Sequence, residues 1–91
     1  MSAPPQEITR VRTAIDEIDD ALLKLVAQRR ALVAEIFEQK RKLALPLIDP
    51  AREQALLLDR GVRAEAANIP RPLVEALFRA ILDDSHNTAR G

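Results

Sequence analysis

The apolar residues between Pro5 and Pro46 are spaced as in one long helix. No glycine or other proline interrupts this segment. Its apolar positions advance mostly in steps of three and four residues, through Ile8, Val11, Ile15, Ile18, Leu22, Leu25, Leu32 and Ile36. This is a heptad seam held for about four repeats, which predicts one continuous helix packed lengthwise against another helix.

Two shorter helices are expected in the second half of the chain. One should run from Pro50 to about Ala67, with Asp49 as its N-cap and Gly61 as a weak point inside it. The other should begin near Pro72. Its buried side is expected to carry Leu73, Val74, Leu77, Phe78, Ile81 and Leu82. No stretch alternates as a strand does, so the predicted fold class is all-α, with three helices per chain.

The length of the first helix predicts a partner. A helix of about 37 residues spans about 55 Å, whereas a compact chain of this size has a radius of gyration near 12 Å. Two shorter helices cannot cover such a rod, so we expect an intertwined homodimer with two-fold symmetry. Residues 1–91 are predicted to form a single domain, with residues 1–5 and 89–91 as loose tails.

Composition excludes several classes of function. The chain has 14 basic and 14 acidic residues, which argues against nucleic acid or an anionic membrane as a partner. Cysteine is absent and His86 is the single histidine, so we expect neither thiolate chemistry nor a metal site. The N-terminal residues do not have the pattern of a secretory signal, and no apolar run is long enough for a bilayer span. We therefore expect a cytoplasmic protein.

Cations stand where the seam should be apolar. Arg29 occupies a seam position, and Arg12 and Lys40 lie in the column beside it. Arg29 could pair with an acid across the dimer and fix helix register. Alternatively, Arg29 and Lys40, about 16 Å apart along the axis, could bracket a small polyanion. Arg12 is about 26 Å from Arg29 on a straight helix, so it could join that ligand only from the other chain of an antiparallel dimer.

Two more polar residues have alternative explanations. Arg52 falls in the first turn of the second helix, where a cation is repelled by about 0.3–1 kcal/mol. An anionic ligand would offset that cost, or Arg52 could be a surface arginine paired with a nearby acid. Ser85 continues the apolar stripe of the third helix. It could contact a ligand or bond to its own backbone.

Taken in order, these motifs resemble a known family. "IDEID", the "QRR" that supplies Arg29, Lys40 eleven residues later, "DPARE" and "DDS" are similar to the all-helical chorismate mutases of the short, stand-alone bacterial kind. The resemblance covers roughly residues 8–88. It implies an isomerase that converts chorismate to prephenate on the route to phenylalanine and tyrosine, by a [3,3] rearrangement that needs no cofactor. It also implies an intertwined dimer with two active sites.

The resemblance further implies roles for individual residues. Arg29 should bind one carboxylate of chorismate, and Arg12 of the other chain should bind the second. Lys40 should reach the ether oxygen and a carboxylate. The remaining substrate-binding residues that it implies lie in the second half of the chain.

In that half, Glu53 should accept a hydrogen bond from the ring hydroxyl, helped by the backbone at Asp49. Ser85 should contact the polar edge of the ligand, and Arg52 should line the same pocket. One position departs from the family. A glutamine or glutamate usually follows this serine by one helical turn and bonds the ether oxygen, and here that position is Ala89.

The departure keeps other functions open. The same fold could act on 4-amino-4-deoxychorismate, or eliminate pyruvate from isochorismate. A third hypothesis is that the chain forms a helical dimer without enzymatic activity, which serves as an interaction or regulatory module.

Overall fold

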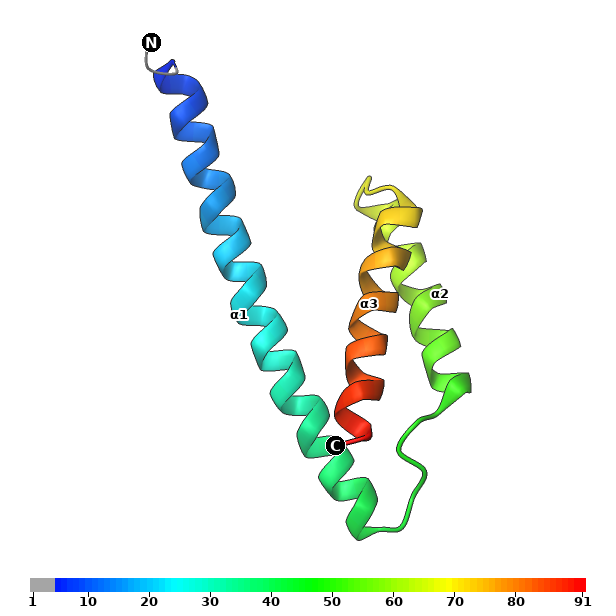
Figure 1. Ribbon diagram of the computed structural model, residues 1–91. Coiled ribbons are helices and arrows are strands. Elements are labelled where there is room, and N and C mark those ends of the chain that lie inside the picture. Colours follow the sequence, from blue (N-terminus) through cyan, green and yellow to red (C-terminus); the bar gives the residue numbers. More distant parts are fainter. Residues whose placement is uncertain (1–4) are drawn as a thin grey trace. The chain divides into compact units, whose positions relative to one another are not determined.

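The computed structural model describes residues 5–91. These residues form three α-helices joined by two short connections (Figure 1). The helices are α1 (Gln6–Lys42), α2 (Pro50–Ala66) and α3 (Arg71–Ala89). Within the described residues there is no strand, so the all-α prediction is confirmed, as is the very long first helix of 37 residues. The chain divides into two compact units, Met1–Leu32 and Val33–Gly91, and each is described by itself.

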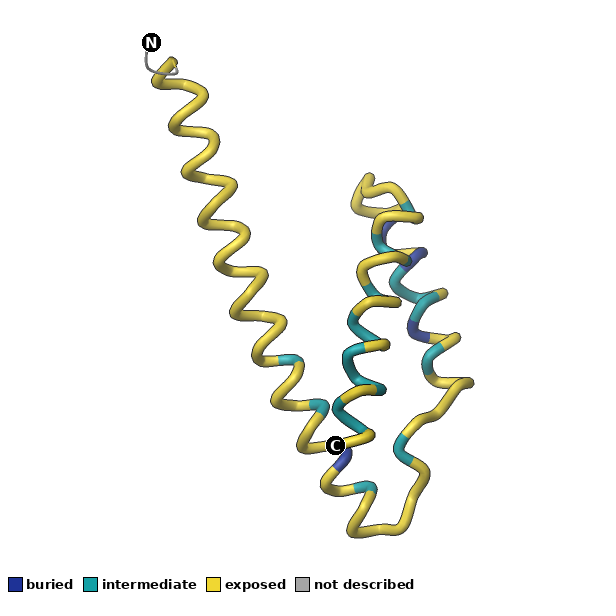
Figure 2. Tube along the Cα trace, viewed as in Figure 1, coloured by how far each residue is buried: buried dark blue, intermediate teal, exposed yellow. Residues whose placement is uncertain are grey.

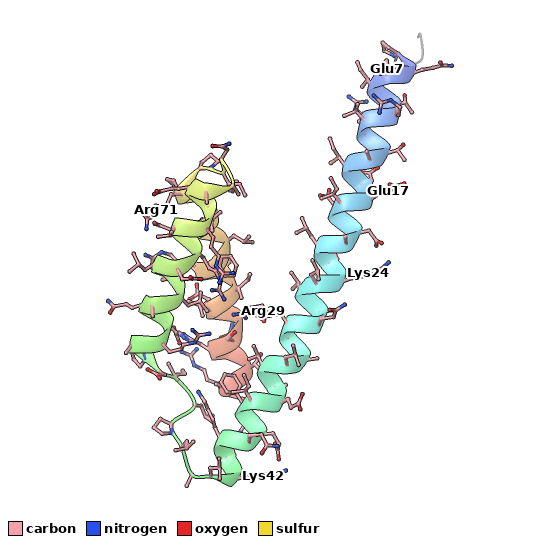
Figure 3. The ribbon with its side chains drawn as sticks, turned by 180° about the vertical axis from the view of Figure 1, so that it is seen from behind. Glu7, Glu17, Lys24, Arg29, Lys42 and Arg71 are labelled. Carbon is pink, nitrogen blue, oxygen red and sulfur yellow. The ribbon has the colours of Figure 1, made fainter. Side chains whose placement is uncertain are left out.

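The first unit is the N-terminal part of α1, a single helix whose described surface is open. Residues 5–28 are all exposed (Figure 2), and charged side chains such as Glu17 and Lys24 project from it (Figure 3). Exposed ion pairs one turn apart join Lys24 to Asp20 and Arg10 to Glu7, each at 3.0 Å. The seam residues are also exposed, from 44% at Ile8 to 61% at Ile18. Nothing within this unit covers the seam.

In the second unit, α1 ends in a tight reversal. Ala44 has a positive φ of 55°, and its N–H donates to the Arg41 carbonyl at 3.1 Å. The N–H of Leu45 donates to the Lys40 carbonyl at 2.8 Å. This pair of bonds is the Schellman pattern, which satisfies the last carbonyls of a helix and turns the chain back. The reversal directs residues 45–49 toward the start of α2.

The start of α2 follows the sequence prediction. Asp49 is extended, with φ −122° and ψ 96°, and its side chain accepts from the N–H of Arg52 at 3.1 Å. Pro50 opens the helix, where its missing N–H has no helical partner to lose. The predicted N-cap is therefore confirmed.

The α2 and α3 helices run antiparallel and pack against each other (Figure 1). Leu56 and Ala64 of α2 are buried at 5% and 3% exposure. The predicted buried side of α3 is wrong in part, because Leu73 and Leu77 are 61% and 48% exposed. Its other four members are half-buried: Val74, Phe78, Ile81 and Leu82. A single partner helix covers a narrow stripe, and positions 73 and 77 lie about 100° around the axis from 74 and 78.

Gly61 lies within α2 and is buried, although it was expected only to weaken the helix. Its missing side chain leaves room for Arg71, since a Cβ at position 61 would lie 2.5 Å from the Arg71 Nε. Arg71, at the start of α3 (Figure 3), also pairs with Glu65 at 2.8 Å and with Glu75 at 3.3 Å. The glycine thus leaves room for the guanidinium group of Arg71 against α2.

Candidate functional site

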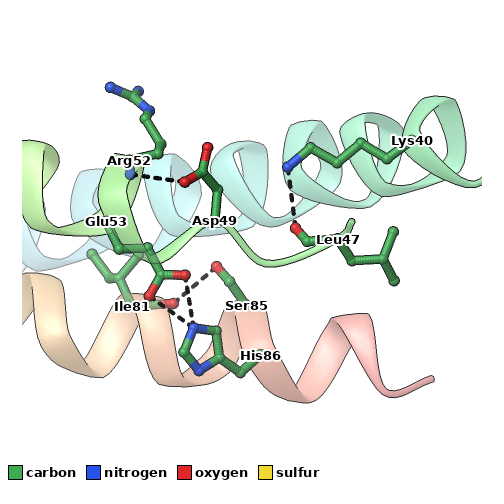
Figure 4. A network of polar contacts seen from close by, with 8 residues as sticks. All are labelled: Lys40, Leu47, Asp49, Arg52, Glu53, Ile81, Ser85 and His86. Carbon is green, nitrogen blue, oxygen red and sulfur yellow. Dashed lines mark hydrogen bonds and ion pairs between the residues drawn. The ribbon is translucent and has the colours of Figure 1, made fainter. Parts of the chain in front are cut away.

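Lys40 lines a pocket beside the end of α1. Lys40 is half-buried, and its Nζ donates to the carbonyl of Leu47 at 3.1 Å (Figure 4). The pocket has a volume of about 410 Å³. It is lined by Lys40, Leu45, Pro46, Ile48, Asp49 and Pro50. Because the Schellman turn folds the loop back over the last turn of α1, a cation and the first residues of α2 meet at one cavity.

Asp49 contacts the backbone N–H of Arg52 and not its guanidinium group. Asp49 uses one carboxylate oxygen to cap α2 at the Arg52 N–H. Both residues are exposed, and the Arg52 side chain extends away from Glu53 (Figure 4). Asp49 lines the Lys40 pocket and Arg52 is not among its lining residues. The ligand contact of Arg52 stays a prediction.

Glu53 contacts His86, a residue to which the sequence assigned no role beside Glu53. The His86 Nε2 lies 2.9 Å from both Glu53 oxygens (Figure 4). The two side chains are 29% and 23% exposed. They border a second pocket of about 310 Å³, whose other lining residues are Leu57, Arg79, Leu82 and Asp83. One signal was available in the sequence, since His86 follows Phe78 and Leu82 in steps of four along the face of α3 that meets α2.

Ser85 and Ala89 lie one turn apart at the end of α3. The Ser85 hydroxyl donates to the carbonyl of Ile81 at 3.1 Å, within its own helix. This is the backbone bond weighed above as the alternative to a ligand contact, and the hydroxyl oxygen keeps lone pairs that can accept. The carbonyl of Ala89 accepts from Arg41 at 3.3 Å. The methyl group of Ala89 has no donor for a ligand.

Arg12 and Arg29 belong to the first unit. Arg12 is exposed, whereas Arg29 is half-buried and has a polar or electrostatic interaction of its own. The roles of Arg29 as a register-fixing charge and as a ligand for a carboxylate both stay predictions. The structure brings Lys40 and Asp49 together at one pocket, and Glu53 lies one turn after Asp49 on α2.

Among residues 5–91, no group of three or more histidine, cysteine, aspartate or glutamate residues is arranged to hold a metal ion. None of the described helices combines the length and apolar character needed to cross a membrane. A cytoplasmic location stays a prediction of the sequence.

An all-α chain that brings a lysine and a capping aspartate together with apolar residues at one pocket defines a small helical domain with a cavity that carries charges of both signs. Comparison with known proteins then identifies its family. Residues 11–89 match the model described as chorismate mutase type II, and the chain belongs to that family. It is 40% identical to a T-protein of Enterobacter agglomerans over 82 residues, which cover 90% of this chain and 22% of the relative.

Other relatives carry the word mutase in their names. A chorismate mutase of Methanocaldococcus jannaschii is 30% identical over 84 residues, covering 92% of this chain and 83% of that protein. A bifunctional chorismate mutase/prephenate dehydratase of Enterobacter agglomerans is 33% identical over 82 residues. The chain spans 22% of the T-protein and 21% of the bifunctional enzyme. No solved structure is a significant match. The family resemblance noted in the sequence is confirmed.

Proposed function

We propose that this chain is a chorismate mutase that rearranges chorismate to prephenate as an intertwined homodimer. The observation that carries the proposal is the Lys40 ammonium group, fixed by the Leu47 carbonyl at a pocket shared with Asp49. It occurs in a chain that matches the chorismate mutase type II family over residues 11–89. The exposed apolar seam of α1 supports the dimer, because a continuous apolar stripe is stable in water only when another helix covers it.

The chemistry of the reaction needs what these residues offer. Chorismate carries two carboxylates, and it rearranges only when its enolpyruvyl group folds over the ring. As the carbon–oxygen bond breaks, the ether oxygen gains negative charge. An enzyme lowers the barrier by holding the folded conformer and by aiming preorganised positive charge at that oxygen. A millionfold acceleration corresponds to about 8 kcal/mol of barrier.

The proposed roles divide between binding and electrostatic stabilisation. Lys40 stabilises the ether oxygen, and Arg29 and the Arg12 of the partner chain bind the two carboxylates in forked geometry. Glu53 accepts from the ring hydroxyl. Asp49, Arg52 and Ser85 complete the polar edge of the site. The charge of the dianion offsets the cost of an arginine in the first turn of α2.

The test is turnover of chorismate by purified protein. We expect the ultraviolet absorbance of chorismate to fall while prephenate forms. No turnover at micromolar enzyme would reject the proposal.

Arg29→Ala should abolish activity while the dimer persists in sedimentation. Loss of folding in this variant would instead favour the register role of Arg29.

A second candidate keeps the fold and changes the substrate. Ala89 is the observation that favours it, because the family's usual donor to the ether oxygen is missing at this position. Assays of chorismate, 4-amino-4-deoxychorismate and isochorismate side by side distinguish the candidates by which substrate has the highest kcat/KM. A dimer without enzymatic activity predicts no thermal shift with a bicyclic diacid that mimics the transition state.

A further inference from the structure

We propose that His86 is a positioning residue for Glu53, holding its carboxylate in the orientation that receives the ring hydroxyl of the substrate. The inference rests on the proposed function for the identity of that ligand. The contact between the two side chains does not depend on it, since both groups belong to this chain.

The chemistry of the carboxylate gives the direction of the hydrogen bond. One ring nitrogen, Nε2, lies 2.9 Å from each of the two Glu53 oxygens. An ionised carboxylate only accepts hydrogen bonds, so Nε2 carries the hydrogen and shares it between both oxygens. The pair is largely shielded from solvent, at 29% and 23% exposure, which makes a charge-assisted bond stronger than it would be in water.

The contact joins two helices and restrains a flexible side chain. Glu53 stands in the first turn of α2, and His86 stands near the end of α3. A glutamate has three side-chain torsions, and ordering a side chain of this kind on binding costs free energy. A clamp between two side chains of the protein itself lowers that cost for substrate binding.

The contact with His86 leaves the Glu53 carboxylate able to accept a hydrogen bond from the substrate. A carboxylate offers about four lone-pair sites, and a single shared N–H occupies the space between the two oxygens. The pocket of about 310 Å³ that Glu53 and His86 line leaves open volume beside the carboxylate. Asp49, which lines the Lys40 pocket, precedes Glu53 by one helical turn on α2. The remaining lone pairs are therefore available to a hydroxyl.

Kinetics of two variants test the role. His86→Ala removes the donor, whereas His86→Gln keeps an N–H at about the position of Nε2. We expect His86→Ala to raise KM for chorismate about three- to tenfold with little change in kcat, the size expected from freeing one flexible side chain. His86→Gln should restore most of the lost kcat/KM. Gln54→Ala, at the exposed neighbour of Glu53, is the matched control and should leave both constants unchanged.

A spectroscopic measurement tests the clamp without reference to activity. Because the chain has one histidine, protein labelled with ¹⁵N-histidine gives ring signals that need no assignment. We expect a downfield ring N–H proton, correlated with Nε2 and slow to exchange with water. It should be present in the full chain at neutral pH, lost in Glu53→Ala and retained in Gln54→Ala.

The two kinds of failure are distinguishable. Absence of chorismate turnover by the wild-type chain rejects the proposed function. Equal kcat/KM in the wild type and His86→Ala, or a ring N–H signal that survives Glu53→Ala, rejects the positioning role. Equal losses of thermal stability and kcat/KM in His86→Ala and His86→Gln would also reject it, because they would mark His86 as a packing residue.

Discussion

Ala89 occupies the position at which the family resemblance implies a glutamine or glutamate, and its place on α3 makes this departure testable. It lies one turn after Ser85, is half-buried, and is still helical. A glutamine at this position would add a donor on the face of α3 that carries Ser85. Since a single preorganised donor toward developing negative charge is worth about two to three orders of magnitude in kcat when removed, adding one should have a measurable effect.

We therefore expect Ala89→Gln to raise kcat for chorismate about tenfold, below the full value of an evolved donor. Steady-state kinetics on the purified variant measures the change. Ala80→Gln, at an exposed position of the same helix, is the control and should leave kcat unchanged. A decrease in kcat for Ala89→Gln would show that Lys40 already acts in a site without room for a second donor.

Asp59 provides a prediction about pH. Its carboxylate accepts from Arg60, and it also pairs with the Arg63 Nε at 3.1 Å. The hydrogen bond from Arg60 is the main reason that the pKa of Asp59 lies below its ordinary value of 3.8, and the charge of Arg63 adds to it. A carboxyl whose pKa is lowered by folding stabilises the protein above its unfolded pKa. That contribution is lost as pH falls through the folded pKa.

The thermal stability of the wild type should therefore exceed that of Asp59→Asn near neutral pH, and the difference should shrink as pH falls below 3.8. Thermal denaturation of both proteins across this range, at one protein concentration, measures it. A difference that stays constant with pH would contradict the assignment of the effect to the ionised carboxylate.

The site could be predicted from sequence only where local rules apply. The capping role of Asp49 follows from residue type and the following Pro50, and the structure confirms it. The bond from Lys40 to the Leu47 carbonyl depends on how the loop turns back. The contact between Glu53 and His86 joins residues 33 positions apart on two helices. The steps of four from Phe78 to His86 indicate which face of α3 carries the histidine, but they do not specify its partner on α2, because that depends on how the two helices pack.

At the level of the elements, the end of α1 carries a conformational cost. Ala44 has φ 55° in the Schellman turn, where glycine is the usual residue. A left-handed conformation costs a non-glycine residue about 1–2 kcal/mol. Glycine avoids this cost, but it loses about 0.5–1 kcal/mol more conformational entropy on folding than alanine does. The sequence did not signal this turn, because the residue that normally marks it is absent.

Ala44→Gly should thus increase the free energy of unfolding by about 0.5–1 kcal/mol. Urea denaturation at equal protein concentration measures the change, since association alters apparent stability. Ala67→Gly is the matched control: Ala67 caps α2 with an ordinary φ of −95°, so glycine there should not stabilise. Equal effects of the two substitutions would argue against strain at Ala44.

The sequence predicted where a helix begins better than it predicted which face of a helix is buried. Proline and the capping aspartate define where α2 begins, so that boundary was correct. The buried face of α3 was too broad, because Leu73 and Leu77 are apolar yet exposed. An apolar residue on a helix can be buried only where a neighbouring element covers it, and α2 covers only part of the apolar surface of α3.

At the scale of the whole molecule, the open seam of α1 and the position of Arg12 lead to one decisive prediction. The proposed dimer gives each active site Lys40 from one chain and Arg12 from the other. Arg12→Ala and Lys40→Ala should therefore each be inactive as homodimers. A heterodimer of the two variants would collect both substitutions in one site and leave the other site intact.

Mixing the two inactive variants, unfolding them together and refolding should restore activity to about a quarter of the wild-type level, because half of the random dimers are mixed and each has one intact site of two. Chorismate turnover before and after refolding measures the recovery. Each variant refolded alone is the control and should stay inactive. If Arg12 served the site of its own chain, every site in the mixed dimer would lack one cation and no activity would return. Recovery of activity would thus establish at once that the chain dimerises and that Arg12 acts across the interface.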